Sequence, residues 1–134
     1  MNIQVRELRL RRGSRVLEVD FEDGRRAVLP FEYLRVYSPS AELWGHGRAE
    51  PLLVGGKRDV SVTRVEPVGQ YAIRLVFDDG HNTGLYSWEV LDRLAREQER
   101  NWARYEERLA EVGMSRDRDV TTLAALGPRI YRPE

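Results

Sequence analysis

Apolar and polar residues alternate along most of the first 86 positions, which is the pattern of half-buried β-strands. Leu17–Phe21 and Ala27–Phe31 alternate on either side of Asp23-Gly24, and Tyr71–Phe77 alternates before Asp79-Gly80. Asp-Gly between two alternating runs is a strong β-hairpin signal, because the tight turn that joins two strands needs residues that tolerate positive φ. We therefore expect an antiparallel hairpin at each of these turns.

Weaker alternation predicts two further strands. The apolar residues from Ile3 to Leu10 change phase near Arg6-Glu7, which indicates a strand with a β-bulge. Val60 to Val65 forms another short alternating run. The segment between them, Ser38 to Lys57, is rich in glycine and proline and is expected to be mostly loop.

The last third of the chain changes to a helical period. Ser87 is a suitable N-cap and Gly113 a suitable C-terminal stop, so we expect one helix over residues 87–112. Its stripe follows a seven-residue repeat: Trp88, Leu91, Ala95, Gln98, Trp102, Tyr105, Leu109 and Val112. At about 1.5 Å per residue this helix would be nearly 40 Å long, more than a small sheet covers. Its far half would then pack against the C-terminal tail (Leu123, Leu126, Ile130, Tyr131) or against a second copy of the chain.

Two stretches of the sequence resemble one another. Leu17–Gly24 is echoed 56 residues later by Ile73–Gly80, and both are followed by a Leu, a Glu and a second Leu in matching order. Either Asp-Gly hairpins recur by coincidence, or the domain is pseudo-symmetric. We expect an α+β fold with a small, mostly antiparallel sheet, a short helix after residue 30 and one long C-terminal helix. The domain would span 1–112, followed by a tail over 113–134.

Composition narrows the classes of function. The chain has no cysteine, which excludes disulfides, thiolate zinc sites and cysteine nucleophiles. The 22 basic and 22 acidic residues balance, although residues 1–15 carry five arginines and one glutamate. A nucleic-acid-binding domain usually has a larger basic excess, so nucleic acid is not an expected partner. No apolar run has the length of a signal or membrane segment, and we expect a cytoplasmic protein without membrane contact.

The chain offers few residues for chemistry. His46 and His81, the two histidines, could form a metal site with nearby carboxylates such as Glu42 and Asp79. In the alternative interpretation, His81 only packs or caps beside its hairpin turn. Gly55-Gly56-Lys57 lacks the spacing of a phosphate-binding loop and is expected to be a tight turn. No nucleophile and base can be paired, so the sequence does not predict an enzyme.

A set of ordered motifs gives a resemblance. These are Leu34-Arg-Val-Tyr-Ser-Pro-Ser-Ala-Glu42, Gly45-His-Gly47, Gly56-Lys-Arg-Asp-Val60, Val65-Glu-Pro-Val-Gly69 and Phe77-Asp-Asp-Gly-His-Asn-Thr-Gly-Leu-Tyr-Ser-Trp88. Over about residues 5 to 97 the chain resembles the gamma-butyrobetaine hydroxylase-like N-terminal domain family. That family includes stand-alone bacterial proteins of unassigned function, N-terminal domains of iron- and 2-oxoglutarate-dependent hydroxylases, and domains attached to Mrp/ApbC-type ATPases that handle iron–sulfur clusters.

The resemblance also implies where a metal is missing. In the hydroxylases this domain holds a structural zinc with three cysteines and one histidine, and those positions fall on Ser38, Ser40, Leu43 and His81. Three of the four ligands are therefore absent, and we expect no zinc site of that type and no cofactor. The catalytic domain of the hydroxylases has no counterpart in 134 residues.

We therefore expect a non-enzymatic protein-binding module. Its partner would be an Mrp/ApbC-type ATPase, which implies an accessory role in iron–sulfur or iron metabolism, or a second copy of the chain bound through the long helix. The alternative is a metal- or small-ligand-binding protein that uses His46 and His81. Trp88 is expected in the core or at an interface. The candidate binding residues are Ser38, Ser40, Glu42, His46, Asp79, His81 and Trp88.

Overall fold

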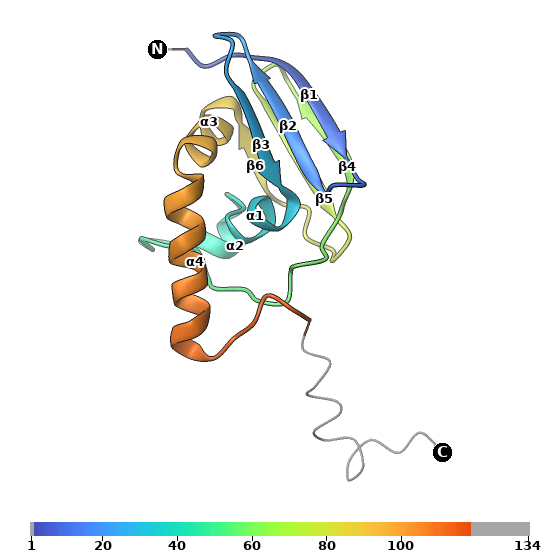
Figure 1. Cartoon of the computed structure of the whole chain (residues 1–134). Coiled ribbons are helices and arrows are strands. Elements are labelled where there is room, and N and C mark those ends of the chain that lie inside the picture. The colour runs from blue at the N-terminus through green and yellow to red at the C-terminus, as the bar shows by residue number, and fades with distance from the viewer. Residues whose placement is uncertain (1, 119–134) are drawn as a thin grey trace, which may run out of the picture.

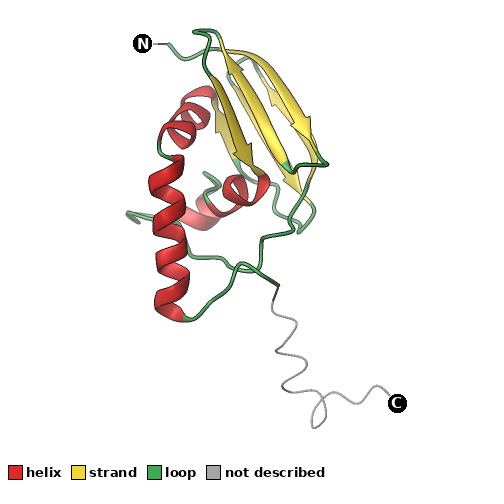
Figure 2. Cartoon of the chain, in the orientation of Figure 1, coloured by secondary structure: helices red, strands yellow, loops and turns green. Residues whose placement is uncertain are grey.

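The computed structural model describes residues 2–118, which form two three-stranded antiparallel sheets and four helices. The first sheet has the order β1-β2-β3 and the second the order β4-β5-β6. The strands are β1 (Val5–Arg11), β2 (Val16–Phe21), β3 (Arg26–Pro30), β4 (Val62–Val68), β5 (Ala72–Phe77) and β6 (Leu85–Ser87). The helices are α1 (Phe31–Val36), α2 (Ala41–Trp44), α3 (Trp88–Arg96) and α4 (Gln98–Val112). The α+β class and the short helix after residue 30 are confirmed, while the strands form two sheets rather than one (Figures 1 and 2).

One hydrophobic core joins the two sheets and the helices. The inward positions of β2 and β5 supply Leu17, Phe21, Leu75 and Phe77, each at most 2% exposed. The helices lie on one side of the sheets, with α4 the outermost in the view of Figure 1. The Arg12 side chain donates to the carbonyl of Thr63 at 2.7 Å and so links the turn between β1 and β2 to β4.

The repetition predicted from the sequence is present in the backbone. Gly24 and Gly80 both have φ +92°, in the region that favours glycine. The amide of Phe21 donates to Arg25 at 2.8 Å, and that of Phe77 donates to His81 at 2.9 Å. β1 carries the predicted bulge, which lies opposite the end of β2. β4 carries a bulge at the matching place, opposite the end of β5. The frame β-β-β-α therefore occurs twice.

The register shows how the two copies align. Leu17 pairs with Leu29 in the first copy, and Ile73 pairs with Tyr86 in the second. Tyr86, rather than the neighbouring Leu85, therefore occupies the place of Leu29. The second hairpin loop is one residue longer, which explains why the sequence offset grows by one.

Ion pairs cross between the two copies. Arg35 of α1 donates to Asp79 in the turn of the second hairpin at 2.7 Å. Asp92 of α3 lies 2.7 Å from Arg25 in the turn of the first hairpin. Each helix is thus tied to the hairpin of the other copy.

The structure divides the segment 87–112 into two helices at Glu97, where the backbone has φ −100° and ψ 8°. The prediction of one continuous helix is therefore wrong. The physical reason lies in α1: the Tyr33 hydroxyl donates to the carbonyl of Leu94 at 2.7 Å, the acceptor that Gln98 would use in a regular helix. Asn101 in turn donates to the Tyr33 oxygen at 3.1 Å. The predicted N-cap is confirmed, since Ser87 accepts a hydrogen bond from the Val90 amide.

The far part of the predicted helix is covered by the same chain. Tyr105 and Leu109 are buried, and the Tyr105 hydroxyl donates to the carbonyl of Val54 at 2.7 Å. Gly113 ends α4 in the left-handed conformation, as predicted. The far half of the helix, which led us to expect the tail or a second chain as its packing partner, is therefore covered by other residues within 2–118. Val112 alone stays exposed among its predicted apolar positions. The tail residues from Leu123 onward lie outside the described part.

Residues 113–118, which we name the strap, return from α4 to the loop before β4. The Gly56 amide donates to Ser115, and the Arg58 amide donates to Arg116. The Arg116 guanidinium binds both carboxylate oxygens of Glu32 at 2.9 and 2.8 Å and lies over the Trp102 ring at 5.0 Å. The folded unit therefore includes the strap, beyond the boundary predicted at residue 112.

Candidate functional site

The turn of the β5–β6 hairpin fixes the position of His81. Asp79 accepts a hydrogen bond from the His81 amide at 3.1 Å, and the His81 carbonyl accepts from Phe77. This local network holds the backbone, while the imidazole points inward and its side chain is only 2% exposed. The turn therefore presents a histidine to the interior rather than to solvent.

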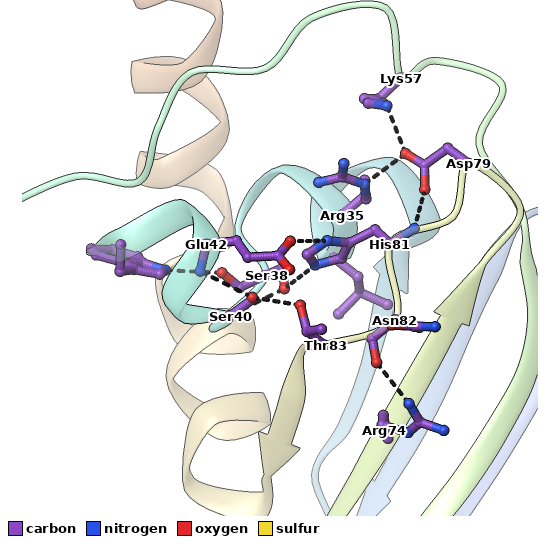
Figure 3. A network of polar contacts seen from close by, with 12 residues as sticks. Arg35, Ser38, Ser40, Glu42, Lys57, Arg74, Asp79, His81, Asn82 and Thr83 are labelled. Atoms are coloured by element: carbon purple, nitrogen blue, oxygen red, sulfur yellow. Dashed lines mark hydrogen bonds and ion pairs between the residues drawn. The ribbon is translucent and has the colours of Figure 1, made fainter.

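The interior partner of His81 is Ser38, which follows α1. The Ser38 Oγ and the His81 Nε2 are 2.8 Å apart, and Ser38 is completely buried. Beside them, the Ser40 Oγ lies 2.7 Å from the Thr83 Oγ1 and also caps α2 (Figure 3). A Cβ at Gly84 would collide with the Ser38 oxygen, so this approach requires glycine. The pairs Ser38–His81 and Ser40–Thr83, which we name the polar pin, fasten the α1–α2 connection to the second hairpin.

A carboxylate stands on the other side of the imidazole. The Glu42 Oε2 lies 3.6 Å from the His81 Nδ1, and the Glu42 side chain is largely exposed. Burial, together with nearby Arg35, lowers the pKa of His81 below its ordinary value, against the opposite pull of Glu42 and Asp79. His81 is therefore neutral near pH 7, and its ring can both donate and accept a hydrogen bond.

The order serine, histidine, carboxylate matches the arrangement of a catalytic triad. The burial of Ser38 decides against that role, because a substrate carbonyl must reach the serine oxygen and this oxygen is enclosed by His81, the Ser40 amide and Gly84. The three groups act on one another and stabilise the fold.

A second cluster surrounds Asp79. Its Oδ2 accepts from Arg35 at 2.7 Å and from Lys57 at 2.6 Å (Figure 3). Burial alone would raise the pKa of Asp79, but hydrogen bonds from Lys57, the His81 amide and Arg35 hold it at about 2. The Arg35 Nη1 is buried and has no hydrogen-bond partner among the residues described. Asp79 thus joins α1, the loop at Lys57 and the second hairpin.

The structure brings together five of the seven predicted site residues, namely Ser38, Ser40, Glu42, Asp79 and His81. His46 is not among them, because it lies exposed in the turn after α2 and makes no hydrogen bond or ion pair with His81 in the described part. Trp88 lies elsewhere, packs against the core and donates to the carbonyl of Gln70 at 2.9 Å. Sequence reasoning missed Arg35, Lys57 and Thr83. The single lysine of the chain is the one signal that pointed toward Lys57.

The residues at the family's zinc-ligand positions do not fit zinc. Serine oxygens and a leucine are not the donors of structural zinc sites, which use cysteine and histidine. Leu43 is buried as part of the apolar interior, and the His81 nitrogen that faces this region is bonded to Ser38. Within residues 2–118, no group of three or more His, Cys, Asp or Glu residues is arranged to hold a metal ion.

Together the fold and the polar pin define a small α+β domain of two repeated units whose buried polar groups bind one another. The chain belongs to the gamma-butyrobetaine hydroxylase-like, N-terminal family, whose model matches residues 8–92. This confirms the resemblance drawn from the motifs. A comparison with curated proteins gives no match.

Three solved structures are similar over most of their length. A protein known from an NMR solution structure is 49% identical, with a TM-score of 0.76 and 87% of each chain covered. A second NMR solution structure is 44% identical, with a TM-score of 0.75, and covers 87% of this chain and 91% of the other. The third is a crystal structure of a DUF971-family protein of unknown function from Acidithiobacillus ferrooxidans ATCC 23270. It is 48% identical, with a TM-score of 0.58, and covers 69% of this chain and 92% of the other.

None of the helices in the described part has the length and apolar character needed to cross a bilayer.

Proposed function

We propose that this chain is a non-enzymatic protein-binding module that works in the cytoplasm. The observation that supports this most is the state of its reactive side chains: Ser38, His81 and Asp79 are all bonded to neighbours inside the domain. Arginine and aromatic side chains, by contrast, line the grooves of its surface. A domain whose reactive groups are bonded internally, and whose surface grooves carry arginine and aromatic side chains, suits a protein that presents a rigid surface to a partner.

An Mrp/ApbC-type ATPase is the partner that the family resemblance supports, through an accessory role in iron–sulfur or iron metabolism. The test uses the full chain and the purified ATPase of the same organism, mixed and measured by light scattering after size exclusion. A complex with the summed mass supports the proposal. Two separate peaks at concentrations up to about 100 µM contradict this partner, because an affinity weaker than that corresponds to less than about 6 kcal/mol.

A homodimer is the other binding mode, and the same measurement tests it. The chain alone has a mass of 15.6 kDa, so a dimer elutes with twice that mass. Photo-crosslinking in the native cell, with the crosslinker at exposed positions on α4, then reports any other partner. A monomer in solution together with no crosslinked protein contradicts the module proposal as a whole.

Metal binding through His46 and His81 is a second proposal, supported by the Glu42 carboxylate that lies next to the His81 Nδ1. Carboxylate and imidazole together suit iron or manganese. The test is calorimetric titration of untagged protein with each metal, alongside His81→Ala and His46→Ala. Binding that both variants lose supports this site. Less than about a tenth of an equivalent bound, with no rise in melting temperature, contradicts it.

A further inference from the structure

A groove of about 590 Å³ lies between the loop that carries α2 and the face of α3 and α4. One wall is aromatic and proline-rich, with Trp44, Pro39 and Pro51. The other wall carries three arginines, Arg93, Arg100 and Arg104, and one glutamate, Glu97, on the helices. The groove therefore combines an apolar wall with a cationic one. None of these residues belongs to the polar pin.

The cations of the groove differ in how they are engaged. Arg93 makes no ion pair with any residue in 2–118, and Arg100 pairs with Glu97 at 3.1 Å through an exposed contact. Exposed pairs of this kind contribute little, so both guanidinium groups are available to a ligand. Arg104 shows what they accept: it donates to both oxygens of Glu50, at 2.7 and 3.2 Å, and lowers the pKa of that carboxyl. A carboxylate is thus already bound at one end of the groove.

The length of the helical wall favours a peptide over a small molecule. The wall runs from Val90 on α3 to Arg104 on α4, about 9 Å along each helix at 1.5 Å per residue, which gives room for several residues of extended chain. Arg93 lies on α3 and Arg100 on α4, and both line this wall. One segment lying along the wall can therefore meet both guanidinium groups with acidic side chains on the same face, since alternate residues of an extended chain share a face.

We propose that this groove binds an extended acidic segment of a partner protein. Acidic side chains on one face of the segment would pair with Arg93 and Arg100, and apolar side chains on its other face would pack against Trp44 and the two prolines. Arginine binds carboxylates with paired, directional hydrogen bonds, which gives both register and specificity. This inference rests on the proposed function and names the surface that would carry it.

The test is fluorescence anisotropy with a labelled Glu-Leu-Pro-Glu-Leu-Glu peptide and the full chain. We expect saturable binding that weakens as salt is added, and about tenfold weaker binding by the double variant Arg93→Gln/Arg100→Gln, since each of the two lost exposed ionic contacts accounts for a factor of about three. The matched control is Arg6→Gln/Arg64→Gln, which removes the same charge from exposed positions on β1 and β4 and should bind like the wild type. Circular dichroism verifies that all variants are folded.

Three results overturn the groove proposal: no binding at about 1 mM peptide, equal binding of the Gln-Leu-Pro-Gln-Leu-Gln peptide, or equal losses in the two double variants. The groove proposal and the proposed function can fail independently of each other. Peptide binding with no partner in the cell leaves the groove proposal standing and contradicts the module. Partner capture that is unaffected by Arg93→Gln/Arg100→Gln overturns the groove proposal and leaves the module in place.

Discussion

Individual polar side chains in this domain stabilise connections that the backbone alone does not make. Ser38 and His81 are 43 residues apart in the chain and 2.8 Å apart in space. Asp79 gathers three donors from three different elements. An unpaired buried polar group destabilises the folded state. Each of these residues therefore stabilises the fold only while its hydrogen-bond partners are present.

The Asp79→Asn variant should lower the free energy of unfolding by about 2 kcal/mol at pH 7, because a carboxyl with a pKa of about 2 stabilises the fold relative to its ordinary value of 3.8. This stabilisation is present above about pH 4 and is lost as the pH falls toward 2. Urea unfolding at pH 7 and pH 2.5 measures it, and the difference between the two proteins should fall to less than half at the lower pH. Asp59→Asn is the control, since that exposed residue pairs only with exposed Arg15. Equal losses in both variants would contradict this account.

The buried His81 predicts a second pH dependence. Its pKa is lowered in the folded state, so the unfolded chain binds a proton first as the pH falls below about 6.5, and stability is then lost. We expect wild-type stability to drop between pH 7.5 and 5, and His81→Gln to show a smaller drop over the same range. His46→Gln, which changes an exposed histidine, should follow the wild type. An unchanged pH dependence in His81→Gln would refute the prediction.

Among the elements, the strap shows how a short irregular segment stabilises a helix. Arg116→Met should cost about 3 kcal/mol, because Glu32 is 7% exposed and would keep a buried charge without its paired donor. The variant also loses the contact with the Trp102 ring. Urea unfolding followed by tryptophan fluorescence measures the change. Asp117→Asn, which alters an exposed pair with Arg58 in the same segment, should cost less than about 1 kcal/mol.

Sequence periodicity predicted the elements because it reports which face of each is buried. The hairpins, the bulge in β1, the Ser87 cap and the Gly113 stop all follow from local residue types. The break at Glu97 could not be predicted, since the Tyr33 hydroxyl that takes the Leu94 carbonyl comes from a distant helix. The same holds for the site: the motifs located Ser38 and His81, but only the tertiary fold brings Arg35 and Lys57 onto Asp79.

At the scale of the whole molecule, the two repeated units form one cooperative domain. They share a core, and each helix is bonded to the hairpin of the other unit. We therefore expect a single unfolding transition. Fluorescence from Trp44, Trp88 and Trp102 and far-ultraviolet circular dichroism should give the same midpoint in urea. Two separated midpoints would show that the units unfold independently.

The match between the two units also has an evolutionary consequence. A frame that repeats in turn geometry, bulge position and register is the expected product of gene duplication followed by fusion. Under that history, the segments without a counterpart are the later additions, namely the long connection from Tyr37 to Ser61 and the chain from Glu97 to Arg118. Ser38, Ser40 and most of the groove lie in these additions, whereas His81 occupies the place of Arg25 in the older frame. Selection for a particular partner would then act mainly on the additions, while the duplicated strands drift only as far as the shared core permits.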